Sequence, residues 1–449
     1  MHILKNRDFL RYYFKLTLPV MIQQLLVNLV SMCDTLMISS VGEDAISAVA
    51  VANKFFFIYS LAIFGLTNGV GLYISQYYGA NDQTSYNRVF RYGNVLCIIV
   101  GALVSVFLFV NPEITISIFV KNPRVIAMGV EYVEVLRWCY IPFAIAGMCS
   151  VAFRVMGHPQ IPMISGLVAF ITNVVLNYLL IMGNFGFPQL GVAGAAIATC
   201  ISRWVEMILL LVIVNRKDSC IRMHVAYGKL PFSLKKDIIA KAIPLMCNEV
   251  MYSLGLSIVF LNFSFMSESS IPALTVVDNI NNLVYVLFSG CGVAIGVMVG
   301  SELGANRIDK AKENAKNMIW MALLTYAIGS ALILITSGIT PKAFSLRADS
   351  LHLATLLLIV KSLLSWTQGY SNTIYYILRS GGDTKSVLII DGLFTWLGPV
   401  LTSTIFSRIF PIDFLFLYIA VEAMGLVKVC IATMFYRKEK WIRNLTQHA

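Results

Sequence analysis

Residues 14–39 read FKLTLPVMIQQLLVNLVSMCDTLMIS, an apolar stretch that contains one proline, Pro19, and one acid, Asp34. About 20 apolar residues cross the ~30 Å hydrocarbon core of a bilayer, so this stretch predicts a membrane-spanning helix. The rest of the chain agrees, because 58% of its 449 residues are hydrophobic and only 13% are charged. Its mean hydropathy is +0.77, whereas soluble domains carry about 25% charged residues. The composition predicts an integral membrane protein and excludes a disordered chain, a coiled coil and a water-soluble enzyme.

Further stretches of similar length and apolarity follow along the chain. The twelve predicted spans cover residues 14–39, 45–78, 89–110, 130–152, 161–183, 190–214, 238–264, 272–300, 317–337, 351–377, 386–406 and 412–436. The first is too long for a signal peptide and has no convincing small-residue cleavage site, so we expect it to be retained. The predicted fold class is an all-α integral membrane protein.

Lys and Arg residues are distributed unevenly between alternate loops. One side of the membrane would carry nearly all of them, and the other would carry only Lys121, Arg124, Lys342, Arg347 and Arg408. By the positive-inside rule, both termini are predicted to be cytoplasmic. The net charge of +11 then reflects topology and not a nucleic-acid partner. We predict a multi-pass protein of a bacterial cytoplasmic (inner) membrane.

The two halves of the sequence are related by one constant offset of 225 residues. The matched positions are Pro19 and Pro244, the triplets Gly79-Ala80-Asn81 and Gly304-Ala305-Asn306, and the pairs Arg154/Gly157 and Arg379/Gly382. A repeat of six spans, an even number, inserts both copies in the same orientation. We therefore predict two six-helix bundles related by a pseudo-two-fold axis along the membrane normal. The N-lobe is predicted at 1–224 and the C-lobe at 225–449, with a basic linker at about 215–237.

Six carboxylates lie at least five residues from either end of a predicted span. They are Asp34, Glu206, Glu249, Asp278, Asp391 and Glu422. A charge at the centre of a span costs about 2.5–3.5 kcal/mol, so each acid needs a partner, a wet cavity or a function. Their counterparts at the offset are not acidic, so the scaffold is repeated but the chemistry is not. We interpret Glu206 and Glu422 as structural, paired with Arg203 and Lys428 on their own helices.

The first span carries a polar stripe. Gln24, Asn28, Ser31 and Thr35 follow one another at spacings of four, three and four, which places them on one helix face beside Asp34. This face is predicted to line a cavity. In the fifth span, Asn173 and Asn177 stand at i and i+4 and offer two amides to the Asp34 carboxylate. The alternative is that these groups are polar contacts that hold helices together.

The second half carries stripes of its own. Glu249 lies near the membrane midplane with Tyr252, and Asp278 shares a stripe with Asn282. Further charges at depth are Lys361, Asp391 and Lys428. Glu249, Asp391 and Lys361 are predicted either to form a protonation or cation-binding network or to form a static ion-pair cluster. Aromatic residues that offer faces to flat cations include Trp366 and Tyr370, with ordinary packing as the alternative.

Motifs of soluble catalysis are missing from the sequence. The five histidines form no H-E-x-x-H motif, no G-x-x-x-x-G-K-S/T phosphate loop occurs, and the cysteines and histidines have no metal-ligand spacing. The sequence therefore predicts neither an enzyme, nor a cofactor, nor a primary ATP-driven pump.

Over essentially its whole length the chain resembles the multidrug and toxic compound extrusion (MATE) family, of the multidrug/oligosaccharidyl-lipid/polysaccharide flippase superfamily. The resemblance rests on Pro19 and Asp34, the Gly79-Ala80-Asn81 loop, FRVMG at 153–157, GVAGAAIAT at 191–199, PLMCNEVMYSLG at 244–255 and LRSGGDT at 378–384. It implies export of organic, often cationic, compounds against inward proton or sodium flow. Asp34 and Glu249 match acids implicated in coupling. Two other acids of some members are replaced by Asn177 and Gln368, which leaves the coupling ion open.

We therefore predict a secondary active antiporter that exports cationic amphiphilic compounds in exchange for protons or sodium by alternating access. The predicted ion-coupling residues are Asp34, Glu249, Asp391 and Lys361. The predicted cavity residues are Gln24, Asn28, Ser31, Asn173, Asn177, Tyr252, Asp278, Asn282, Trp366 and Tyr370. No metal site is predicted apart from a sodium site at Asp34 with Asn173 and Asn177, as an alternative to protonation. The expected partners are an organic cation, a proton or sodium ion and the lipid bilayer, and a monomer is expected.

Two alternatives remain open at this point. One is a flippase or an exporter of a specific metabolite or lipid-linked precursor, which would need a large basic cavity for phosphates. The other is a membrane-embedded enzyme or a non-transporting scaffold, which would show no dependence on an ion gradient.

Overall fold

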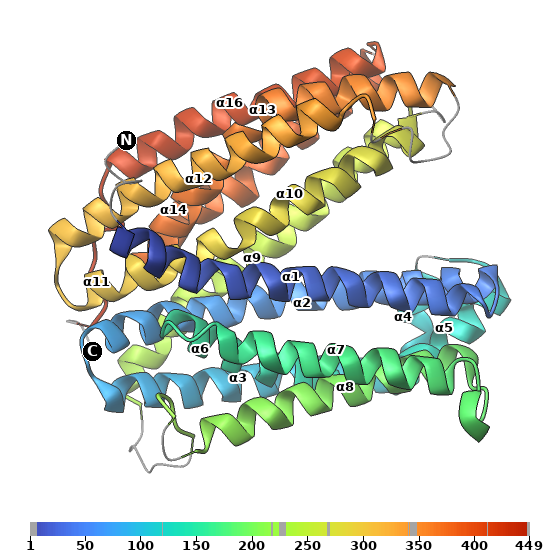
Figure 1. The fold of residues 1–449 in the computed structure, drawn as a ribbon, viewed down its shortest axis with the longest axis horizontal. Helices are drawn as coiled ribbons and strands as arrows, with labels where there is room; N and C mark the ends of the chain where they lie inside the picture. Colours follow the sequence, from blue (N-terminus) through green and yellow to red (C-terminus); the bar gives the residue numbers. More distant parts are fainter. Residues whose placement is uncertain are drawn as a thin grey trace. The chain divides into compact units, whose positions relative to one another are not determined.

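The computed structural model describes residues 7–118, 120–216, 219–223, 230–266, 270–339, 341, 348–410 and 412–446. Within these residues every regular element is helical (Figure 1). Eleven helices are long and apolar enough to cross a membrane, and the count becomes twelve if one bent pair of helices is a single span. The predicted all-helical, multi-span fold is therefore confirmed. The predicted lobe boundary between 224 and 225 lies outside the described residues.

The chain divides into two compact units, an N-terminal unit and a C-terminal unit. The N-terminal unit comprises Leu18–Tyr78 and Asp82–Ala242, and the C-terminal unit comprises Met1–Thr17, Gly79–Asn81 and Ile243–Ala449. Apart from the three residues Gly79–Asn81, the chain passes from one unit to the other inside two continuous helices, α1 (Arg7–Ser39) and α9 (Phe232–Ser264). Both crossing points come just before a proline of the repeat, Pro19 or Pro244.

In the N-terminal unit the elements after α1 follow the order that the spans predict. They are α2 (Glu43–Gly79), α3 (Gln83–Val110), α4 (Pro112–Ser117), α5 (Pro123–Leu136), α6 (Tyr140–Val155), α7 (Gln160–Leu180), the 3-10 turn η2 (Asn184–Gly186) and α8 (Gly191–Val214). Helices α7 and α8 pack side by side, as do α3 and α6. Aromatic rings of α2 and α6 also pack together, with the centroids of Tyr59 and Tyr140 4.7 Å apart.

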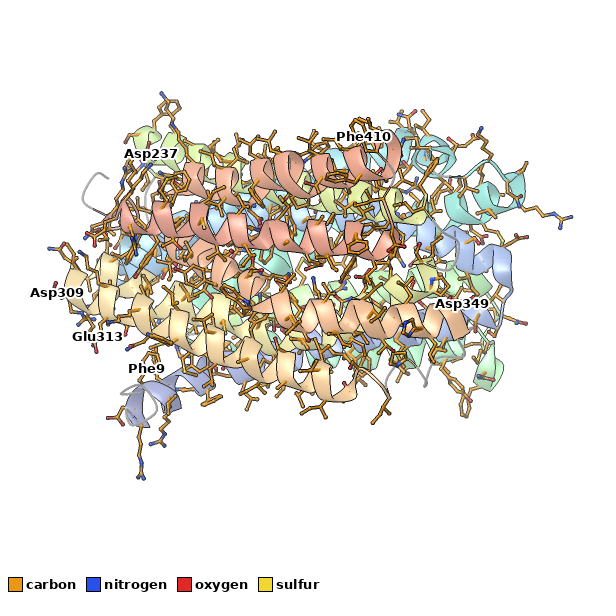
Figure 2. All side chains as sticks on the ribbon, turned by 90° about the horizontal axis from the view of Figure 1, so that it is seen from above. Phe9, Asp237, Asp309, Glu313, Asp349 and Phe410 are labelled. Atoms are coloured by element: carbon orange, nitrogen blue, oxygen red, sulfur yellow. The ribbon has the colours of Figure 1, made fainter. Side chains whose placement is uncertain are left out.

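The C-terminal unit repeats this arrangement after α9. Its elements are α10 (Ser270–Met298), α11 (Gly300–Gly304), α12 (Ile308–Thr336), α13 (Ala348–Ser380), α14 (Thr384–Leu388), the π-helical segments η4 (Ile389–Leu393) and η5 (Trp396–Val400), α15 (Leu401–Thr404), the π-helical segment η6 (Ile405–Ile409) and α16 (Phe414–Arg437). Figure 2 shows Asp309 and Glu313, at the start of α12, at the opposite end of this unit from Asp349 at the start of α13. Consecutive spans therefore run in opposite directions. Apolar side chains of α9, α10, α13 and α16 form one buried core.

The fourth predicted span, 130–152, is not a single straight helix. It is broken at 137–139, and α5 and α6 meet there at 54°. Pro142 has no N–H to donate to the carbonyl of Trp138, which would be its partner in a continuous helix. The indole of Trp204 donates to that carbonyl instead, at 3.2 Å. The hydroxyl of Ser105 donates to the carbonyl of Arg137 at 2.8 Å.

Turns at matched positions of the two halves share the same backbone conformation. Asn81 and Asn306 both have φ of 59°, a left-handed conformation that asparagine tolerates better than most residues. Gly157 and Gly382 have φ of 82° and 75°. The offset of 225 residues found in the sequence therefore extends to the backbone, which supports the pseudo-symmetric fold.

The C-terminal segment after α16 packs back onto the C-terminal unit. Trp441 is only 1% exposed, and its ring stacks on Tyr436 with centroids 5.8 Å apart. Its carbonyl lies so close to Gly381 that a Cβ at this glycine would come within 1.6 Å of the oxygen. Asn444 donates to the carbonyl of Gly304 at 3.3 Å. The segment thus contacts both repeat loops of this unit.

Candidate functional site

The predicted contact between the first-span acid and the fifth-span amides is present in the N-terminal unit. Asn177 of α7 donates through Nδ2 to Asp34 Oδ1 of α1 and, at 3.2 Å, to Asn173 Oδ1. Asn173 donates in turn to the hydroxyl of Thr199 in α8 at 3.4 Å. Both asparagines are buried, at 2% exposure or less. Three helices therefore position the carboxylate of Asp34.

This site keeps unused acceptor capacity. The Oδ1 atom of Asn177 is buried and has no hydrogen-bond partner among the described residues. Arg203 of α8 is within electrostatic reach of Asp34, yet no ion pair joins Asp34 to a base in the described part of the chain. Carboxylate and amide oxygens are ligands that suit a proton or a hard cation. The geometry thus leaves Asp34 accessible to a charge-compensating ion.

The polar stripe of α1 makes its side-chain hydrogen bonds within its own helix. Gln24 donates to Asn28 at 3.5 Å, Ser31 donates to the carbonyl of Val27, and Thr35 donates to the carbonyl of Ser31. Asn28, Ser31 and Thr35 are exposed, and Gln24 is half-buried. Polar groups on an apolar span avoid contact with lipid tails, so this face suits contact with water or a polar ligand.

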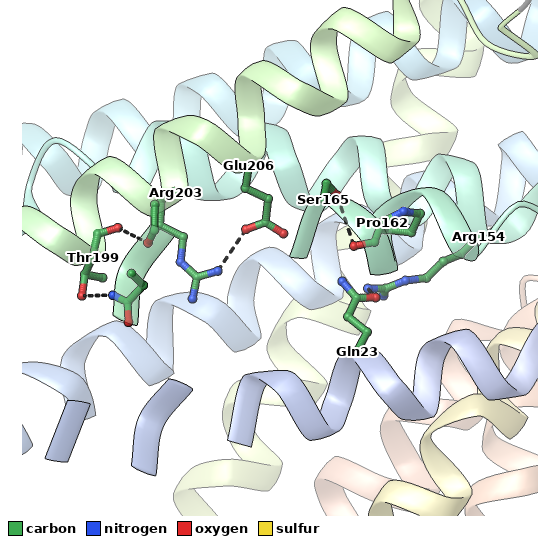
Figure 3. Close-up of polar contacts among 9 residues, drawn as sticks. Gln23, Arg154, Pro162, Ser165, Thr199, Arg203 and Glu206 are labelled. Carbon is green, nitrogen blue, oxygen red and sulfur yellow. Dashed lines mark hydrogen bonds and ion pairs between the residues drawn. The ribbon is translucent and has the colours of Figure 1, made fainter. Parts of the chain in front are cut away.

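Basic residues of the N-terminal unit are held by polar partners inside the helix bundle (Figure 3). Arg154 of α6 donates to Oε1 of Gln23 in α1 at 2.7 Å. Arg203 and Glu206 of α8 form an ion pair at 3.0 Å across one helical turn. The predicted pairing of Glu206 with Arg203 is confirmed. Glu206 is therefore neutralised on its own helix.

In the C-terminal unit Glu249 and Asp391 have separate partners. The hydroxyl of Tyr375 in α13 donates to Glu249 Oε1 at 2.6 Å, and Arg379 Nη1 donates to the same hydroxyl at 3.3 Å. Asp391, in the π-helical segment η4, forms an ion pair with Lys428 of α16 at 2.6 Å. Glu249 and Asp391 are linked indirectly, because Asn248, the neighbour of Glu249, donates to Asp391 Oδ2 at 3.2 Å.

Lys361 is not part of this group, which corrects the predicted network. Its Nζ contacts both carboxylate oxygens of Glu422, at 2.9 and 3.1 Å. Lys361 and Tyr375 are 14 residues apart on α13, which is about 21 Å along the axis at 1.5 Å per residue. The predicted pairing of Glu422 with Lys428 is likewise wrong.

The remaining predicted cavity residues of this unit have different surroundings. Asp278 and Asn282 are exposed on α10, and Trp366 of α13 is 38% exposed. Tyr370 is half-buried, and its hydroxyl is 3.0 Å from that of Thr433. The ring of Tyr252 lies 5.6 Å from Lys428 Nζ, in the geometry of a cation–π contact.

Two important positions were not predicted as site residues. Asn248 contacts both Asp391 and the backbone N–H of Gly392, although in the sequence only its neighbour Glu249 stands out. Arg379 was noted only as a repeat position, yet it is 4% exposed and joined to Glu249 through Tyr375. The sequence signal available for Arg379 was its match with Arg154 in the repeat, at the end of a predicted span.

Similarity to known proteins covers nearly the whole chain. The probable multidrug resistance protein NorM of Thermotoga maritima is 25% identical over 436 residues, which span 95% of this chain and 92% of the relative. The probable multidrug resistance protein YoeA of Bacillus subtilis is 24% identical over 90% of this chain and 89% of its own length.

Solved structures show the same fold. A crystal structure of MATE in complex with MaL6 superposes with a TM-score of 0.87 at 17% identity and covers 96% of both chains. A transporter of the MOP superfamily from Pyrococcus furiosus also gives a TM-score of 0.87 at 17% identity, over 96% of this chain and 95% of its own. The MatE family model matches twice, at residues 19–179 and 244–403, once in each half. The chain therefore belongs to the MatE family of membrane transporters.

Proposed function

We propose that the protein is a secondary active antiporter that exports organic, cationic amphiphilic compounds in exchange for protons or sodium ions. Membership of a transporter family and the names of the curated relatives support drug-like substrates. The observation that carries the coupling part of the proposal is the environment of Asp34. This carboxylate is held by the amide of Asn177 and lacks a direct ion pair among the described residues.

The only hydrogen bond to Asp34 among the described residues comes from a neutral amide, and the nearby Arg203 is paired with Glu206, so binding of a proton or a sodium ion changes the net charge of the site. Asp34 can therefore alternate between a charged state that attracts a cationic substrate and a neutral state that releases it. Antiport requires this mutual exclusion, since the substrate and the coupling ion then compete for one negative charge. The buried Oδ1 atom of Asn177 can serve as a ligand to sodium or accept a hydrogen bond from water, so it leaves both coupling ions open.

The acids of the C-terminal unit have a different proposed role. Glu249 and Asp391 each lie next to a base, directly for Asp391 and through Tyr375 for Glu249. We propose that they respond to the coupling ion or substrate by exchanging partners, whereas Lys361 is structural. The exposed polar positions of α1 and α10 would supply the polar lining of the substrate pathway.

Further parts of the proposal concern the membrane setting. We propose that both termini lie on the cytoplasmic side, on the basis of the distribution of Lys and Arg between loops. The bacterial relatives support a bacterial cytoplasmic membrane, and a monomer is part of the proposal. The lobes of residues 1–224 and 225–449 would rock against each other to alternate access. Pro19 and Pro244 would serve this motion, because each removes a backbone hydrogen bond inside its helix.

The proposal is tested by dye efflux from cells that lack their own pumps, with imposed pH or sodium gradients. Wild-type protein is compared with Asp34→Asn and with Asp309→Asn, a matched control because Asp309 is exposed at the start of α12. We expect wild type and the control to extrude ethidium under one of the two gradients, and Asp34→Asn to lose this gradient dependence. The gradient that drives efflux identifies the coupling ion.

Two outcomes would contradict the proposal. Efflux by Asp34→Asn at the wild-type rate, at equal expression, would show that Asp34 does not couple transport to the ion gradient. Absence of efflux by well-folded wild-type protein would refute the broad drug-exporter function and favour a specific metabolite or lipid-linked precursor.

A further inference from the structure

The carboxylate of Asp391 has two side-chain partners from two other helices, and one of them, Lys428, also lies over an aromatic ring. Its Oδ1 atom contacts Lys428 Nζ at 2.6 Å, and its Oδ2 atom accepts from Asn248 at 3.2 Å. The ring of Tyr252, one turn further along α9 from Asn248, lies 5.6 Å from the same ammonium group. The side chains of Lys428 and Asp391 are only 14% and 11% exposed. A carboxylate and an aromatic face are the two groups that bind an organic ammonium ion.

We propose that Lys428 is a tethered cation that occupies an organic-ammonium site made by Asp391 and Tyr252, and that it leaves when a substrate ammonium group enters. This inference rests on the proposed export function for its transport step, but not for the binding site itself. The tethered cation explains how an intramembrane acid can stay neutralised between transport cycles without an external ion.

The structure distinguishes this pair from the other buried pair of the same unit. Lys361 contacts both oxygens of Glu422, whereas Lys428 contacts only one oxygen of Asp391. The other oxygen of Asp391 is already held by Asn248, so departure of Lys428 leaves the carboxylate with a neutral donor. Asp391 is therefore prepared to exchange one cation for another.

The backbone around Asp391 also suits a rearrangement. Asp391 lies in the π-helical segment η4, and such segments are rare and concentrate at functional sites. Asn248 accepts from the N–H of Gly392 at 2.8 Å, so one residue of α9 holds both the side chain of Asp391 and the following backbone. A change of partner at Asp391 is thereby transmitted to α9, next to Glu249.

The binding site is tested by replacing the tethered cation with a free one. The purified full-length Lys428→Ala variant is melted with increasing n-propylammonium, which has the three carbons and the ammonium group that the substitution removes, and is compared with wild type and with the double variant Asp391→Asn/Lys428→Ala. We expect a saturable rise in Tm for the single variant alone, because a ligand that binds only the folded state stabilises it.

Two results would overturn the proposed binding site. An unchanged Tm of folded Lys428→Ala, or an equal rise in the double variant, would overturn the site. If Lys428→Ala aggregates, the readout becomes its yield of monodisperse protein after expression with and without n-propylammonium. Recovery by the amine supports the site, and equal yields overturn it.

The departure of Lys428 is tested separately with Lys428→Arg. A guanidinium keeps the charge but grips a carboxylate with two parallel hydrogen bonds, so it is held more firmly than an ammonium. We expect Lys428→Arg to keep the wild-type Tm and to lose most dye efflux, whereas a merely structural pair would leave efflux unchanged. Wild-type efflux by this variant would overturn the departure step. Failure of the wild-type protein to export dye would instead refute the proposed function and leave the amine-binding result standing.

Discussion

The ion pair between Lys361 and Glu422 allows a quantitative prediction for a purely structural role. The ammonium lies 2.9 Å from one carboxylate oxygen, and the two side chains are 14% and 21% exposed. At an effective dielectric constant of about 20, two unit charges at this distance attract by about 6 kcal/mol. Removal of one partner from a buried pair costs about 3–5 kcal/mol, and partial exposure places this pair near the lower end.

We therefore expect Lys361→Met and Glu422→Gln each to lower the free energy of unfolding by about 3 kcal/mol. The double variant leaves no unpaired charge, so it should cost about 3 kcal/mol or less instead of the additive value of about 6 kcal/mol. Glutamine is chosen because it keeps an acceptor for Tyr418, which also interacts with Glu422. The measurement is reversible detergent-induced unfolding of wild type, both single variants and the double variant.

Dye efflux completes this test. We expect the double variant to retain efflux, because Lys361 and Glu422 compensate each other and are removed together. If the destabilisation by the two single substitutions were additive in the double variant, the assigned pairing would be refuted. If a stable double variant lost efflux, Lys361 or Glu422 would take part in ion coupling.

The other predictions concern the C-terminal segment. Trp441→Ala removes a side chain that is 1% exposed and stacked on Tyr436, so we expect it to cost about 3 kcal/mol and to make residues after Arg437 sensitive to protease. Gly381→Ala should release the same segment, because its Cβ would lie within 1.6 Å of the carbonyl of Trp441. Gly296→Ala is the control, because a Cβ at this glycine would meet nothing within 4 Å, so we expect its Tm and the protection of the segment to stay close to wild type. Protection of the segment in Gly381→Ala equal to wild type would contradict this docking.

The spans and the repeat could be predicted because both depend on local properties of the sequence. Burial in lipid requires a long apolar run wherever it occurs, and a duplicated turn keeps its residues, as Asn81 and Asn306 do. The break at 137–139 was missed because the apolar residues that follow Arg137 let the stretch pass for one span. Only the position of Pro142 relative to Trp138 marks the lost hydrogen bond.

Charge pairing was predictable within one helix and not between helices. Arg203 and Glu206 stand three residues apart, so they lie on the same face, and their predicted pair is present. Glu422 and Lys428 stand six residues apart and point in different directions, so each finds its partner on another helix. The choice of Lys361 for one and Asp391 for the other depends on how α13 and η4 lie along α16. No periodicity in the sequence contains this information.

The break in the fourth span couples sequence changes in α3, α6 and α8. The hydroxyl of Ser105 in α3 and the indole of Trp204 in α8 donate to carbonyls that the break leaves without helical partners. Loss of either donor leaves a backbone carbonyl without its hydrogen bond while the break persists. A continuous helix would restore the hydrogen bond to Trp138, but this requires a residue with a backbone N–H in place of Pro142. Among relatives of this chain, we therefore expect the residues at the positions of Ser105, Pro142 and Trp204 to change together and not one at a time.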